Sequence, residues 1–269
     1  MDIRRCWMIA AFELNRLFMT RRGLIALAAF ALFWFVIFYY LISRGAEILN
    51  SPAFADMAKQ TFGQLGLSEI YQWPMAELAI YWLIAIYLYP AMTVMMSADQ
   101  TASDRDRGTL RFLVLRSTRS EILLGRFIGQ VLIMALLSGI SLLAALVMGS
   151  MQNAAVIVVT GVIALGLWGH LLLALLPFIA LMTLFNGFLR SARQSVLVAS
   201  LALGGLSILL SLLSYWYPSL SILEYVLPGN DLTDLLSLPG QSLQSYLQPG
   251  LQTIGLLLLA WMINQRSAL

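Results

Sequence analysis

Six long apolar runs constrain this chain more than any other feature of its sequence. A helix needs about 20 apolar residues to cross the roughly 30 Å of hydrocarbon in a bilayer. The six segments that approach this length are 24–42, 78–97, 127–149, 154–185, 195–215 and 247–263. With 60% hydrophobic and 11% charged residues, the chain has too little polar surface to cover a soluble globule. We therefore predict an all-α polytopic membrane protein, with a single transmembrane domain over residues 1–269 and six transmembrane helices.

The basic residues predict the orientation of these spans. Taken in order, the apolar runs place 14 of the 16 Lys and Arg residues on one side, and only Arg44 and Lys59 on the other. Cytoplasmic loops carry an excess of Lys and Arg, so we expect both termini in the cytoplasm and the protein in the plasma (inner) membrane. The net charge of +3 then reflects topology and contact with membrane lipid, and no nucleic-acid partner is expected.

Segment 1–23 has the pattern of an amphipathic helix. The residues that define it are the apolar stripe Trp7, Ala11, Leu14 and Phe18 and, away from that stripe, Arg5, Glu13 and Arg16. Because basic residues follow just before the first span, we expect an interfacial helix on the inner membrane surface that turns at Gly23. A plain cytoplasmic extension of the first span is the alternative.

The longest basic segment, 98–126, combines a helix break with a new helix start. Gly108 ends a polar stretch, and Thr109 can cap the short helix that follows. Thr118 and Glu121 then have capping-box spacing for a further helix. The short helix is too apolar for a solvated loop and must bury against the bundle, lipid or a partner through Leu110, Phe112, Leu113 and Leu115.

Segment 216–246 has no basic residue and is expected outside. Pro-Gly pairs delimit two short stretches, 231–238 and 241–248, which are too short to cross a bilayer and predict a re-entrant helical hairpin. An ordinary surface loop is the alternative. Aromatic residues flanking the second and fifth spans predict an outer belt of Tyr71, Trp73, Tyr81, Trp82, Tyr215, Trp216 and Tyr217.

In their order, these elements resemble the permeases of type-2 ATP-binding-cassette (ABC) exporters over nearly the whole chain. The matching motifs are Glu13-Leu14 before Arg21-Arg22, the acidic stretch from Asp104 into Gly108-Thr109-Leu110, the helix restart from Ser120 to Arg126, and the segment from Leu189 to Ser195. Ser117-Thr118 stands where the family often has Pro, and Arg126 where it commonly has Lys. The branch therefore stays open between cofactor maturation of the nitrous oxide reductase type and drug export.

The resemblance implies a permease that couples ATP hydrolysis by a separate cytosolic ABC ATPase, in two copies, to export or conformational work. It also implies a second copy of the permease around a two-fold axis. The chain lacks the P-loop pattern, and Lys59 is its only lysine, so we expect no enzyme activity and no cofactor in the chain itself, with ATP bound by the partner.

The residues expected to contact the ATPase fall into two sets. The coupling set is Arg107, Gly108, Thr109, Leu110, Arg111, Phe112, Leu113 and Arg116, with Leu110 and Leu113 as apolar anchors. The interfacial-helix set is Arg5, Trp7, Glu13, Leu14 and Arg16. By analogy, the path would lie between the two copies, lined by the second and fifth spans. Ser200, Ser207 and Ser211 share a face of the fifth span, where helix packing through small residues is the favoured interpretation.

Other functions use other residues. His170, the only histidine, lies within the fourth span and could serve an intramembrane hydrolase with Ser141, but their expected depths differ by about 12 Å. Met92, Met95 and Met96 could bind a soft metal, although packing explains them better, so no metal site is expected. A structural membrane subunit would keep the topology without needing the apolar short helix.

Overall fold

A computed structural model describes residues 2–49, 73, 75–100, 108, 110–152, 157–189, 191–229 and 244–266. Over these residues the regular structure is entirely helical. Six helices are long and apolar enough to cross a membrane, which confirms the predicted fold class. Their bounds are Gly23–Leu49, Ala76–Met96, Arg119–Met151, Ile157–Asn186, Ala192–Trp216 and Tyr246–Gln265.

The N-terminal helix α1 (Ile3–Met19) confirms the helix predicted before the first span, while its place at the membrane interface stays a prediction. The first span consists of α2 (Arg21–Val36), the π-helical turn η1 (Ile37–Ile42) and α3 (Ser43–Leu49). The chain turns at Thr20 rather than at Gly23. The Thr20 hydroxyl accepts a hydrogen bond from the Gly23 amide at 3.0 Å and so caps α2. Gly23 is needed because a Cβ there would lie 2.1 Å from the Leu17 carbonyl oxygen of α1.

The remaining helices are α5 (Ala76–Met96), the 3₁₀ turn η4 (Ser97–Asp99), α7 (Leu110–Val114), α8 (Arg119–Gln152), α9 (Ile157–Asn186), α10 (Ala192–Trp216), the 3₁₀ helix η6 (Pro218–Val226) and α11 (Gln244–Arg266). The described residues cover only part of the expected re-entrant hairpin. Helix η6 folds back from the end of α10, whereas 231–238 lies outside the described residues. The expected helix 241–248 is not separate, because the chain from Gln244 onward belongs to α11.

The core lies where α2, α5, α8 and α9 meet. Trp34 of α2 packs its ring 5.4 Å from that of Tyr81 and 5.5 Å from that of Tyr89. The hydroxyls of both tyrosines pair with the Ser141 hydroxyl of α8. The aromatic belt was therefore predicted wrongly at the second span, since Trp73, Tyr81 and Trp82 are buried in the bundle. At the end of α10, Tyr215, Trp216 and Tyr217 are exposed, and Tyr71 lies outside the described residues.

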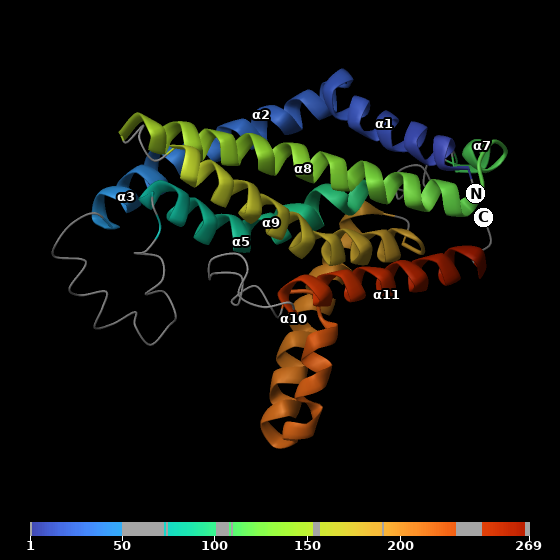
Figure 1. The fold of residues 1–269 in the computed structure, drawn as a ribbon. Helices are drawn as coiled ribbons and strands as arrows, with labels where there is room; N and C mark the ends of the chain where they lie inside the picture. The colour runs from blue at the N-terminus through green and yellow to red at the C-terminus, as the bar shows by residue number, and fades with distance from the viewer. Residues whose placement is uncertain are drawn as a thin grey trace.

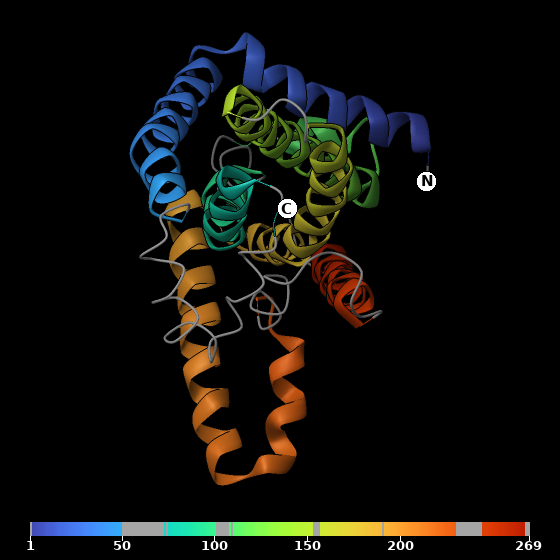
Figure 2. The ribbon, with the colours of Figure 1, turned by 60° about the vertical axis from the view of Figure 1, so that its left-hand side comes forward.

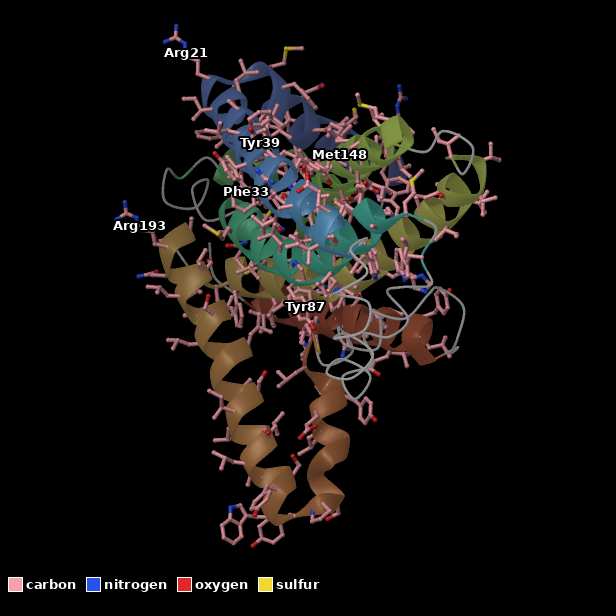
Figure 3. All side chains as sticks on the ribbon, turned by 90° about the vertical axis from the view of Figure 1, so that its left-hand side faces the viewer. Arg21, Phe33, Tyr39, Tyr87, Met148 and Arg193 are labelled. Atoms are coloured by element: carbon pink, nitrogen blue, oxygen red, sulfur yellow. The ribbon has the colours of Figure 1, made fainter. Side chains whose placement is uncertain are left out.

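The helices form a bundle from which one hairpin projects. Figure 1 shows α5, α8, α9 and α11 running along a common direction, with α1 beside α8. The start of α1, the short helix α7 and the end of α11 lie at the same end of this bundle. Helix α10 runs across that direction, and η6 returns beside it (Figure 2). Arg193 marks the end of α10 that lies near the bundle, and the other end points away from the bundle (Figure 3).

A buried polar network anchors the start of α10. The Asn186 side chain donates to the Ser97 carbonyl at 2.8 Å and accepts from the Ser195 hydroxyl at 2.8 Å. One turn earlier on α9, Thr183 donates to the Gln100 side chain at 3.0 Å. The ends of α5 and α9 and the first turn of α10 are thus joined by bonds shielded from water.

Candidate functional site

Helices α1 and α8 approach each other closely through small residues. Gly125 and Gly129 of α8 face α1, and a Cβ at Gly125 would lie 2.8 Å from Ile9 Cβ. A Cβ at Gly129 would lie 2.9 Å from Glu13 Cβ and 3.2 Å from Ala10 Cα. The contact residues move forward along α1 as they move forward along α8, so the two helices run parallel. This Gly-x-x-x-Gly arrangement holds α1 rigidly against the start of α8.

Cys6 lies in the same interface and is 3% exposed. Burial, and to a lesser degree the charge of Glu121, raises the pKa of the Cys6 thiol. The thiol therefore stays neutral and packs as a small apolar group rather than acting as a nucleophile.

The first turn of α8 is capped as its sequence predicts. The Glu121 amide donates to the Thr118 hydroxyl at 3.3 Å, and the Thr118 amide donates to the Glu121 carboxylate at 2.9 Å. Glu121 also accepts a hydrogen bond from the Asp2 amide at 2.8 Å, and Arg5 lies 3.9 Å away. One carboxylate therefore satisfies the cap of α8 and ties the start of α1 to it.

A groove of about 640 Å³ opens between α1, α7 and the start of α8, and we name it the α1–α7 groove. Its lining consists of Arg5, Met8, Ile9, Phe12, Glu13, Arg16, Leu113, Arg116, Ser117 and Arg126. Four arginines face a single carboxylate in this set, and the Arg16 guanidinium lies 3.0 Å from Glu13. The groove thus combines an apolar floor with an excess of positive charge, which suits an acidic and apolar partner surface.

Two apolar side chains at α7 are exposed, Phe112 within the helix and Leu115 just after it. Phe112 is 72% exposed and Leu115 is 82% exposed, whereas Leu113 is half-buried and lines the groove. Helix α8 has 34 residues, about 51 Å at helical rise, so its charged first turns extend beyond the roughly 30 Å of hydrocarbon. Phe112 and Leu115 lie next to these turns as an exposed apolar pair, a feature typical of surfaces that contact a protein or a membrane.

Only part of the predicted coupling set can be placed. Gly108 has a φ of +70°, which confirms the predicted break, because this left-handed conformation favours glycine. Leu110 and Arg111 belong to the backbone of α7, while Arg107 and Thr109 lie outside the described residues. The Arg116 carbonyl accepts a hydrogen bond from Arg5 at 3.4 Å, which links the coupling segment to α1. Leu113, expected as an anchor for the partner, is half-buried and lines the α1–α7 groove, while Phe112 and Leu115 are the exposed pair, so its anchor role stays a prediction.

The face of α1 that packs on the bundle is not the apolar stripe, which was expected to lie at the membrane interface. The buried face is Cys6, Ala10, Glu13 and Leu17, one position out of step with the predicted stripe. Trp7 is 59% exposed, and Leu14 only partly packs against the core. Glu13, which lies away from the apolar stripe as expected, is 8% exposed because the neighbouring glycine of α8 leaves room for its stem and Arg16 balances its charge.

The alternative chemistries find no support in the geometry. Ser141 is hydrogen-bonded to Tyr81 and Tyr89, whereas the His170 ring lies 4.2 Å from that of Tyr246 of α11. No hydrogen bond of the described residues joins Ser141 to His170. Met95 is exposed while Met92 and Met96 pack against the core, so these three do not converge on one site.

Sequence reasoning missed the α1–α8 interface and Arg126. Arg126 is 3% exposed and lines the groove from the third turn of α8. The available signal was the spacing of Gly125 and Gly129, matched on α1 by Cys6 and Ala10 at the same interval.

The comparisons with known proteins agree with this architecture. A family model described as "ABC-2 family transporter protein" matches residues 7–258. The match begins within α1 and ends within α11. No curated protein matches the chain. Since the match covers well over half of the 269 residues, the chain belongs to the ABC-2 transporter family: it is a multi-pass membrane permease of an ABC transporter, which implies a partner ATPase subunit.

Proposed function

We propose that this permease couples ATP hydrolysis by a separate cytosolic ABC ATPase to export or to conformational work across the plasma (inner) membrane. The observation that carries the proposal is the exposed apolar pair Phe112 and Leu115 beside the basic α1–α7 groove. In this proposal both termini are cytoplasmic, ATP is bound by the partner, and the chain carries no cofactor of its own.

The contacts within the site support a mechanical route from the ATPase to the spans. Arg5 of α1 bonds to the Arg116 carbonyl next to α7, and Glu121 of α8 holds the Asp2 amide. Arg119 donates to the Asn264 carbonyl at 2.8 Å, and Trp261 donates to Ser120 at 3.0 Å. A displacement of α7 by the ATPase would therefore move α1, α8 and the end of α11 together.

A second copy of the permease completes the proposal. Against the described residues of the chain, helix α10 buries only Ser195 and Ala199, although it is long enough to span the membrane. A dimer about a two-fold axis would cover its remaining apolar surface and would seat one ATPase per protomer. The path would run between the copies, along α5 and α10.

The proposal is tested by purifying the tagged permease from its own membranes and assaying the purified complex for an ABC ATPase and for ATP turnover. The double variant Phe112→Ser/Leu115→Ser is expected to lose the ATPase, because it removes the apolar contact while leaving the capped start of α8 intact. The matched control is Phe35→Ser/Leu143→Ser, whose side chains are 64% and 62% exposed on the spans. Equal recovery of the ATPase with both double variants would refute the proposed docking site.

A further inference from the structure

The α10–η6 hairpin carries a carboxylate, Glu224, that forms no ion pair with the described residues of the chain. Glu224 lies on η6, is half-buried and accepts a hydrogen bond from Ser214 of α10. The sequence has no Lys or Arg between Arg193 and Arg266. A half-buried carboxylate without a cationic partner is costly, which makes it a candidate for binding a cation.

A cavity of about 390 Å³ lies beside this carboxylate. It is bounded by α10, η6 and the chain just after η6, and Pro90 of α5 and Phe178 of α9 close it on the bundle side. Leu203, Leu210 and Leu227 supply apolar walls. Cavities of roughly 300–1,000 Å³ with apolar walls and a few polar groups are typical of small-molecule sites.

The polar side chains around the cavity offer several acceptors. The Ser207 hydroxyl donates to the Leu203 carbonyl at 2.6 Å, which leaves its oxygen lone pairs for an incoming N–H group. Ser211 lines the same wall of α10, and the Glu224 carboxylate can only accept. Among the described residues that line the cavity, Glu224 is the one charged residue and none is basic. The site therefore attracts a cation and repels an anion.

We propose that this cavity binds an organic cation in which a protonated amine is joined to an apolar body. The ammonium group would pair with Glu224 and donate to Ser207, and the apolar body would pack against Leu210 and the ring of Phe178. The inference rests on the proposed function only in making the bound cation a transported molecule, because binding itself needs no ATPase.

The test is equilibrium dialysis of the purified permease, without its ATPase, in nanodiscs of zwitterionic lipid. Three probes share one ring and differ in the polar group: 2-phenylethylammonium, 2-phenylethanol and 3-phenylpropanoate. The wild type is expected to prefer the cation about tenfold over the alcohol and to bind the carboxylate most weakly, and Glu224→Gln is expected to abolish the preference. Equal binding of cation and alcohol by the wild type would overturn the proposal.

Two further variants separate charge from folding. Glu224→Asp keeps the charge on a shorter side chain and is expected to retain part of the preference for the cation. Glu47→Gln removes an exposed carboxylate that pairs with Arg44 at 3.2 Å on α3, and it is expected to bind all three probes like the wild type. A preference lost equally in Glu47→Gln would also overturn the proposal. Because these assays contain no ATPase, their result is independent of the Phe112/Leu115 test.

Discussion

The α1–α8 interface and the α10–η6 hairpin are both made of long, largely apolar helices, yet the chain covers them very differently. Along α1 and α8, glycines bring two backbones together and each charged group described in the interface has a partner nearby. Along α10, apolar side chains such as Leu201, Ile208 and Leu212 are more than half exposed. The first region is a closely packed interface within one protomer. The second presents an exposed apolar surface for lipid, a second copy or a transported molecule.

The largest loss of unfolding free energy is expected from a bulky substitution in the α1–α8 interface. Gly129→Leu would push a branched side chain into Glu13 and Ala10, where even a Cβ lies 2.9 Å from its neighbour. Overpacking of this kind costs about 3 kcal/mol of unfolding free energy, because two helix backbones must separate. The measurement is denaturant unfolding of the purified permease in detergent.

Gly204→Leu is the matched control, since a Cβ on that glycine of α10 meets no atom within 4 Å. It is expected to leave the unfolding free energy unchanged or to raise it, because leucine is a better helix former than glycine. A loss at Gly204 as large as that at Gly129 would remove the distinction between the two regions.

A smaller effect is expected where the two regions join. Asn186→Ala leaves the Ser97 carbonyl and the Ser195 hydroxyl without their 2.8 Å partner, which costs about 2 kcal/mol. Because these bonds anchor the start of α10, the variant should also be cleaved faster by protease at Leu189–Ser191. Ser195→Ala breaks one of the two bonds and should show about half the loss. Unchanged cleavage in Asn186→Ala would mean that the network does not restrain α10.

The smallest effect on the stability of the protomer is expected from cysteine substitutions that test for a second copy at α10. Leu201→Cys and Val162→Cys, each in a Cys6→Ala background, replace side chains that are both 72% exposed, one on α10 and one on α9. If a second copy covers α10, oxidation in membranes should cross-link the Leu201→Cys protein into a dimer and leave the Val162→Cys protein monomeric. Equal cross-linking at both positions would indicate random collision rather than a specific interface.

Local features were predictable from the sequence because they depend on neighbours in the chain. The capping box at Thr118 and Glu121 was correct, since at this spacing each side chain accepts a hydrogen bond from the other residue's backbone amide at the start of a helix. The break at Gly108 was correct for a similar reason, because its positive φ is costly for other residues. The turn before α2 was wrong by three residues, since Thr20 caps that helix and Gly23 serves a contact with α1.

The sequence by itself determined the class of protein and its six spans, because hydropathy reports whether a segment avoids water. Only the tertiary structure decided which apolar side chains touch protein and which remain exposed on the protomer. Tyr81 and Trp82 have the composition of a membrane belt and lie in the core, while α1 packs through Cys6 and Ala10 rather than through the apolar stripe that includes Trp7. Lipid and protein interior are similarly apolar, so the water-avoidance signal is the same for both, and helix partners are selected by shape, as at Gly125 and Gly129.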